Sequence, residues 1–342
     1  MTAVLQRRGI FQVCAVKMAS NSVAALVMAD VIDYEFGISA VDSGYLRPQL
    51  DAIHLIIEGD RAAVVDTGVN SSVPRVLAAL RAKGIAPAQV DYVILTHIHL
   101  DHAGGAGLLL SQLPNAMLTV HPRGVRHLID PSQLIASTEA VYGSEHMART
   151  YGRILAVPPG RVIETPHAAS IALNGRELVF YDTPGHARHH VCVFDAKSRH
   201  VFAGDTFGLS YRELDDGGRR FIFPTSSPTQ FDPAAEHRSL DLITDLRPPA
   251  IYLTHYGQVR DIARLADDMH RLVDAHEQLG RAGGDAGSER HARLKAGITE
   301  MIRGEARRYG WPLAEERVLE IFAGDIELNA QGLAIWVDTL TP

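Results

Sequence analysis

Residues 96–105 read Thr-His-Ile-His-Leu-Asp-His-Ala-Gly-Gly, and this stretch is the strongest signal of fold and chemistry in the chain. It places His97, His99, Asp101 and His102 close together, directly after an apolar run that is typical of a buried strand. Neutral imidazoles and a carboxylate suit zinc, iron and manganese. In an extended segment His97 and His99 point the same way, while the chain turns at Asp101 and His102. The stretch therefore predicts a metal site that can serve two adjacent ions.

Further candidate ligands stand at other strand ends. Histidine is abundant, at 17 of 342 residues, so an isolated histidine carries little information. However, His186, Asp205 and His255 each stand just past a short apolar run. Open α/β sheets collect their ligands at such strand ends. His or Asp follows each of four strand ends, and this indicates one common metal centre.

Taken in order, these motifs resemble the metallo-β-lactamase superfamily over roughly residues 35–260. The resemblance implies seven ligands: His97, His99 and His186 for one metal, Asp101, His102 and His255 for the second, and Asp205 as a bridge. It also implies that Asp66 supports the ligands without binding metal. The implied fold is α/β, a four-layer αββα sandwich with a C-terminal helical extension. The implied cofactors are two divalent metal ions, zinc first, with iron or manganese as alternatives.

The same resemblance implies hydrolysis by a metal-bridging hydroxide. Asp205 would then be essential as the bridge, and Asp101 is a candidate for passing a proton to the leaving group. True β-lactamases of the superfamily typically carry cysteine in place of Asp205, so this chain is more similar to the glyoxalase II, lactonase and RNA-processing branches. His190 matches a histidine of the family motif and is a candidate catalytic, supporting or substrate-contacting residue. His189 replaces a frequent glycine and stays unassigned.

Three functions remain open from the sequence. The first is hydrolysis of a small ester, thioester or lactone. The second is an iron-dependent redox protein on the same fold, either a diiron oxygen-binding protein or a persulfide dioxygenase, because His and carboxylate ligands also suit iron. The third is a phosphodiesterase or nuclease. The net charge of −7 disfavours this third function, since phosphate contacts require clustered Lys and Arg.

The chain is expected to divide into three regions. Residues 1–33 are interpreted as an N-terminal extension, because polar residues interrupt the apolar core that a signal peptide needs. Residues 34–260 form the metal-hydrolase domain. Residues 261–342 form a helical region packed on the core, where apolar residues recur at helical spacing. The secondary structure of the tail, 325–341, is left open.

Two insertions are expected to shape the substrate pocket. Residues 128–160 and 206–232 are long loops, the usual place for specificity. Their aromatic side chains either contact the substrate or pack against the domain and so hold the loops in place. Candidate substrate contacts are Phe207, Tyr211 and Tyr256, and the spacing does not select between the two tyrosines for a hydrogen bond to a substrate carbonyl.

The composition, 46% hydrophobic and 21% charged, is that of an ordinary globular protein. Cys14 and Cys192 give no disulfide framework, so a reducing cytoplasm is the expected location. No apolar run approaches the roughly 20 residues that a bilayer span requires. We therefore expect a small-molecule substrate and neither a nucleic acid nor a membrane as partner, and we leave open a homodimer.

Overall fold

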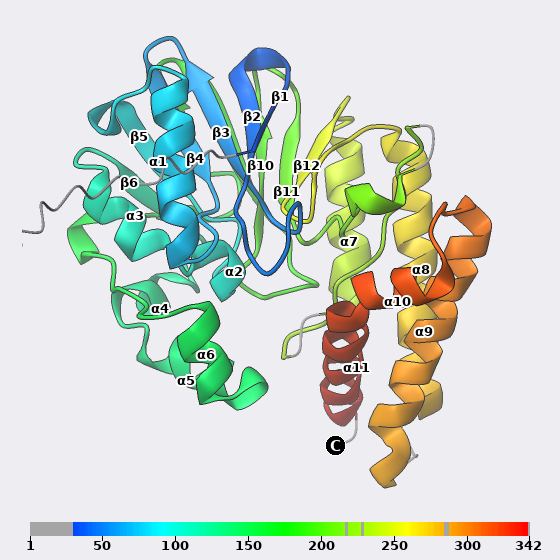
Figure 1. The fold of residues 1–342 in the computed structure, drawn as a ribbon. Coiled ribbons are helices and arrows are strands. Elements are labelled where there is room, and N and C mark those ends of the chain that lie inside the picture. The colour runs from blue at the N-terminus through cyan, green and yellow to red at the C-terminus, as the bar shows by residue number, and fades with distance from the viewer. Residues whose placement is uncertain (1–29, 216–217, 227–228, 284–286, 341–342) are drawn as a thin grey trace, which may run out of the picture.

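The computed structural model describes residues 30–215, 218–226, 229–283 and 287–340. Within them, two β-sheets lie face to face and helices cover both outer faces (Figure 1). The predicted four-layer αββα sandwich is therefore confirmed. Most of the predicted N-terminal extension, and Cys14 with it, lies outside the described residues.

The first sheet has the strand order β1-β2-β3-β4-β5-β6-β7. Neighbouring strands run antiparallel from β1 to β4 and parallel from β4 to β7. The bounds are β1 Val31–Asp33, β2 Ile38–Asp42, β3 Ala52–Glu58, β4 Arg61–Val65, β5 Val90–Ile94, β6 Met117–Val120 and β7 Val162–Glu164. Because β1 pairs with β2, the sheet begins inside the residues that the sequence assigned to the extension.

The second sheet has the strand order β13-β12-β11-β10-β9-β8. The bounds are β8 Ser170–Leu173, β9 Arg176–Asp182, β10 Val191–Asp195, β11 Val201–Gly204, β12 Ile251–Leu253 and β13 Gly257–Val259. Strands β11 and β12 pair in parallel, and the other neighbours pair antiparallel. The carboxyl ends of β11 and β12 therefore meet at one edge, which places Asp205 and His255 near each other.

Apolar residues on both faces of the central strands hold the layers together. In β4, Ala63 and Val65 pack between the two sheets, while Ala62 and Val64 pack against the outer helices. Successive side chains of a strand point to opposite faces, so a strand that is covered on both sides is apolar throughout. This is why Ala62 to Val65 of β4 read as a continuous apolar run.

Helices of the first half cover the first sheet and form an insertion beside it. The bounds are α1 Val73–Ala82, α2 Leu100–Ala103, α3 Ala106–Gln112, α4 Val125–Ile129, α5 Ser132–Tyr142 and α6 Ser144–Thr150. Helices α1 and α3 bury apolar faces against the sheet. The insertion 128–160, expected to be a long loop, contains the helices α5 and α6.

Helices of the second half cover the other sheet and extend beyond it. The bounds are α7 Pro233–Asp245, α8 Ile262–Gly283, α9 Arg290–Tyr309, α10 Glu315–Ile321 and α11 Ala323–Asp338. Short 3-10 helices are η1 Glu35–Gly37, η2 Asn70–Ser72, η3 Pro87–Gln89, η4 Pro159–Arg161, η5 Arg212–Leu214 and η6 Gly287–Glu289. The tail left open by the sequence is α11, which packs against α8 and α9 (Figure 1). In the described ranges, no helix is long and apolar enough to cross a membrane.

Candidate metal centre

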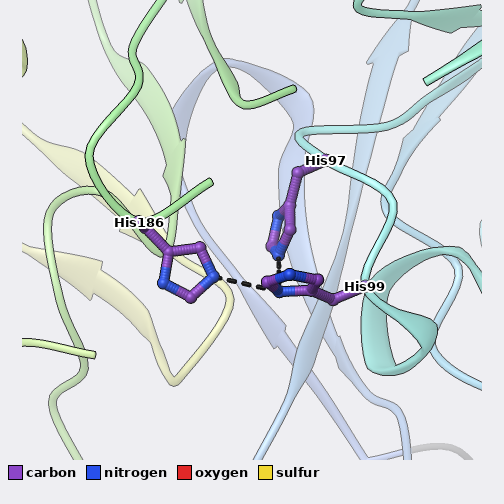
Figure 2. Close-up of side chains that lie close together, drawn as sticks. All are labelled: His97, His99 and His186. Carbon is purple, nitrogen blue, oxygen red and sulfur yellow. Dashed lines mark hydrogen bonds between the residues drawn. The ribbon is translucent and has the colours of Figure 1, made fainter. Parts of the chain in front are cut away.

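The first predicted ligand group, His97, His99 and His186, comes together at the carboxyl ends of the strands. His97 and His99 follow β5, and His186 follows β9 on the other sheet. His97 Nε2 lies 2.8 Å from His99 Nδ1, and His186 Nε2 lies 3.0 Å from the same atom. Figure 2 shows the three rings pointing toward one another. Three imidazole nitrogens therefore meet at one point.

The second group consists of Asp101, His102 and His255. Asp101 Oδ2 lies 3.5 Å from His102 Nε2 and 3.7 Å from His255 Nε2. Asp205 stands between the two groups. Its Oδ1 lies 3.3 Å from His102 Nε2 and 3.5 Å from His255 Nε2, while its Oδ2 lies 3.4 Å from His186 Nε2. One carboxylate thus offers one oxygen to each group, which is the arrangement of a bridging ligand.

Polar partners orient the ligand rings by contacting their Nδ1 atoms. His102 Nδ1 lies 2.9 Å from Asp66 Oδ2, and His186 Nδ1 donates to the Thr225 carbonyl oxygen at 2.8 Å. His255 Nδ1 lies 2.8 Å from Asp51 Oδ1. A proton held on Nδ1 in this way leaves Nε2 free to bind metal. The sequence identified Asp66 but missed Asp51 and Thr225, because only the tertiary fold brings them to the rings.

The charges of His97, His99 and Asp205 suit the binding of cations. Burial, reinforced by the neighbouring imidazoles, lowers the pKa of His97 and His99 well below the usual value, so both rings are neutral. Burial alone would raise the pKa of Asp205, but the imidazoles around it hold that pKa well below its usual range. Its carboxylate is therefore charged.

Two buried atoms at the centre make no hydrogen bond to the part of the protein that the structure describes. His102 Nε2 and Asp205 Oδ1 are both buried, and neither makes a hydrogen bond within the described residues. Buried polar atoms nearly always have a partner. A metal ion bound to these atoms would satisfy both. Together with the group of His97, His99 and His186, the residues present fit a pair of divalent metal ions.

Comparison with known proteins agrees with this geometry. A family model described as the metallo-beta-lactamase superfamily matches residues 52–255, more than half of the chain. The chain belongs to the metallo-beta-lactamase superfamily. The predicted family, read from the ligand motifs alone, is confirmed.

Two relatives illustrate the range of similarity in sequence. ST1585, a metallo-beta-lactamase fold-containing protein from Sulfurisphaera tokodaii, is 26% identical over 228 residues, which cover 65% of this chain and 79% of ST1585. A hydroxyacylglutathione hydrolase from a Synechococcus species is 32% identical over 145 residues. That match covers 42% of this chain and 43% of the enzyme, so it spans less than half of the relative.

Two solved structures share the fold. The crystal structure of ST1585 has a TM-score of 0.62 and 22% identity, covering 87% of this chain and 98% of ST1585. A chemotaxis sensor named ODP, solved as a peroxy diiron species, has a TM-score of 0.50 and 15% identity, covering 71% of this chain and 94% of the sensor. At these identities the likeness concerns the fold.

His190 contacts the backbone of Asp205. Its Nε2 accepts a hydrogen bond from the Asp205 backbone N–H at 3.2 Å. Its Nδ1 lies 2.9 Å from Thr183 Oγ1 and 3.0 Å from Thr206 Oγ1. Both ring nitrogens thus bind protein groups, and the ring is fully buried. This geometry favours a positioning role for His190 over the substrate contact that the sequence left open.

Replacing His190 with alanine is expected to lower turnover by about 10–100-fold while the bound metals are retained, because the residue supports a ligand without binding metal itself. Kinetic assays and elemental analysis of the variant would test this. His167→Ala, which removes an exposed ring, serves as the control. Loss of a metal ion from His190→Ala would contradict the positioning role.

A cavity of about 890 Å³ opens over the metal ligands. Leu134 and Val141 of α5 line one side, and Ile321 of α10 and Leu328 of α11 line another. Two of the C-terminal helices therefore reach this cavity. His189, unassigned from the sequence, also lines it, and its ring stacks on that of His97 at a centroid distance of 6.1 Å.

The three predicted substrate contacts have different surroundings. Tyr211 lines the cavity, but its hydroxyl donates to the Asp325 carboxylate at 3.0 Å. Phe207 and Tyr256 are buried in the core and are not among the residues that line the cavity. The structure therefore supports Tyr211 as a cavity residue and gives no support to substrate contacts by Phe207 or Tyr256.

Proposed function

We propose that this protein is a binuclear metal hydrolase that cleaves an ester, thioester or lactone, with zinc as the metal. The observation that carries the proposal is the position of Asp205, whose two oxygens face the two ligand groups. A bound metal pair would supply an activated water and polarise the substrate carbonyl. The similarity to a hydroxyacylglutathione hydrolase supports acyl chemistry of this kind.

The protein supplies a proton acceptor and a defined pocket. Asp101 lines the cavity, and its side chain is 24% exposed, so a bound substrate can reach its carboxylate. We assign it the transfer of a proton between the attacking water and that group. His190 holds the Asp205 backbone in place during the reaction.

The cavity favours a substrate with an apolar acyl part. Its volume of about 890 Å³ is that of pockets for drug-sized ligands, and leucines from α5 and α11 are among its lining residues. Among the described residues that line it, Arg47 is the only arginine or lysine, and it pairs with Glu213. An uncharged ester or lactone therefore suits this pocket better than a multiply charged thioester.

Elemental analysis and the absorption spectrum of the purified protein test the proposal, together with assays on esters, thioesters and lactones. We expect about two zinc ions per chain, no visible band and turnover of at least one acyl class. The second candidate is an iron-dependent redox protein, because the same ligands suit iron and a diiron sensor shares the fold. Iron with a visible band that responds to oxygen would favour it and overturn the hydrolase.

A substitution in the apolar wall tests the substrate class. Leu328→Asp is expected to lower kcat/KM for a long-chain acyl ester at least about tenfold while that for the acetyl ester changes little. Loss of contact with about two methylenes, at about 0.8 kcal/mol each, accounts for this factor. Leu328→Met, which conserves volume, should behave like the wild type. Equal losses on both esters would contradict an acyl-binding wall.

A further inference from the structure

Outside the metal centre, a second histidine cluster lies between α7 and α8. His237 and Asp241 belong to α7, and His270 and Asp274 belong to α8. The members of each pair are four residues apart, so they lie on one face of their helix. The two imidazole rings are parallel, with centroids 5.0 Å apart and an interplanar angle of 2°. Their Nδ1 atoms face each other at 2.7 Å.

A carboxylate faces the outer nitrogen of each ring. His237 Nε2 lies 3.1 Å from Asp274 Oδ1, and His270 Nε2 lies 3.4 Å from Asp241 Oδ1. Each histidine therefore pairs with the aspartate of the opposite helix. A metal-binding histidine typically ligates through one nitrogen and donates from the other to a carboxylate. The cluster contains this arrangement twice, around one point.

Two neutral imidazole rings cannot donate a hydrogen bond to every acceptor in this arrangement. A neutral imidazole carries a single N–H, and only one proton fits between the facing Nδ1 atoms. The ring that supplies that proton must turn an unprotonated Nε2 toward a carboxylate. A cation between the Nδ1 atoms removes the mismatch, because both rings then carry their proton on Nε2 and donate it to the aspartates.

The spacing of the rings resembles that of the metal centre. There, imidazole nitrogens that share one point lie 2.8 and 3.0 Å apart, close to the 2.7 Å found here. The side chains of His237 and His270 are 26% and 30% exposed, so an ion can reach them from solvent.

We propose that His237 and His270 bind one divalent transition-metal ion through their Nδ1 atoms, with water completing the coordination. Two imidazoles with open positions suit Ni²⁺, Cu²⁺ and Zn²⁺. Bound there, the ion would join α7 to α8, the first of the C-terminal helices. This site is separate from the metal centre and does not depend on the reaction proposed above.

The site is tested by titrating the zinc-loaded protein with Ni²⁺ and measuring the heat of binding by calorimetry. The wild type is expected to bind one Ni²⁺ per chain without releasing zinc, and His237→Ala and His270→Ala are expected to lose that binding. Asp274→Asn should weaken it by about 10–100-fold. The matched control is His291→Ala, which removes an exposed histidine that also faces a carboxylate, that of Glu327 at 3.0 Å, and should bind Ni²⁺ like the wild type.

Thermal unfolding supplies a second readout. Ni²⁺ should raise the unfolding midpoint of the zinc-loaded wild type but not that of His270→Ala, because an ion that binds only the folded state stabilises it. The proposal is overturned if the wild type binds no Ni²⁺, if nickel uptake equals zinc release, or if both histidine variants retain the wild-type affinity. A proton shared by the two rings would then explain their close approach.

Discussion

Asp205→Ala is expected to abolish turnover while the fold is retained. The side chain lies between the two ligand groups and offers an oxygen to each, so its loss removes a ligand from both. Removing a residue that merely supports a metal ligand lowers metal affinity or activity about 10–100-fold. Removing the bridging residue should lower activity by more than that. Kinetic assays, elemental analysis and circular dichroism of the variant would measure activity, metal content and fold.

Asp60→Ala is a suitable control for this prediction, because Asp60 is an exposed residue of the turn between β3 and β4. It should retain both metals and full activity. If Asp205→Ala kept near-wild-type turnover, the binuclear centre would be wrong. If it lost structure as well as activity, Asp205→Asn, which keeps the shape of the side chain without its charge, would separate the two effects.

Arg176→Ala is expected to destabilise the fold by about 3–5 kcal/mol, because it leaves the carboxylate of Asp195 buried without its oppositely charged partner. Both side chains are fully buried, and Arg176 Nε donates to Asp195 Oδ1 at 2.9 Å. Arg176 also donates to the Phe36 carbonyl oxygen at 2.7 Å, which joins the second sheet to η1 beside the first sheet. Urea denaturation at neutral pH would measure the loss.

An exposed ion pair provides the control for Arg176→Ala. Arg293 pairs with Glu289 at 3.0 Å on the surface, and the side chains are 63% and 71% exposed. Exposed pairs at this helical spacing contribute about 0.3–0.5 kcal/mol, so Arg293→Ala should have a small effect. Similar free energies of unfolding for the two variants would contradict the importance of the buried pair.

The buried pair also predicts a pH dependence. Burial would raise the pKa of Asp195, but hydrogen bonds from Arg176 and Ser198 lower it below its usual value. A depressed carboxyl pKa stabilises the folded state above the unfolded value of about 3.9, and this contribution is lost as the pH falls through the folded pKa. The stability difference between the wild type and Asp195→Asn should be full at pH 7 and shrink below about pH 4. A stability difference that stays constant across this pH range would contradict a lowered pKa of Asp195.

The ligand motifs were readable because each of them stands just past an apolar run. A strand that is buried on both faces is apolar along its length, so a polar residue at its end stands out. Asp205 and His255 follow β11 and β12, and this proximity to a recognisable strand made them predictable. His190 was harder to interpret, because its role depends on whether the ring turns toward the cavity or toward the Asp205 backbone.

The ligand motifs can be read from local patterns of apolar and metal-binding residues, and their resemblance to the superfamily implies the family and the αββα class. Apart from Asp66, the residues that support and enclose the centre are known from the tertiary structure and not from the sequence. Asp51 reaches His255, α11 forms a wall of the cavity, and His237 meets His270 through contacts between segments that are distant in the chain. Such contacts follow from how helices and sheets pack, and neither hydrophobic periodicity nor motif spacing carries that information.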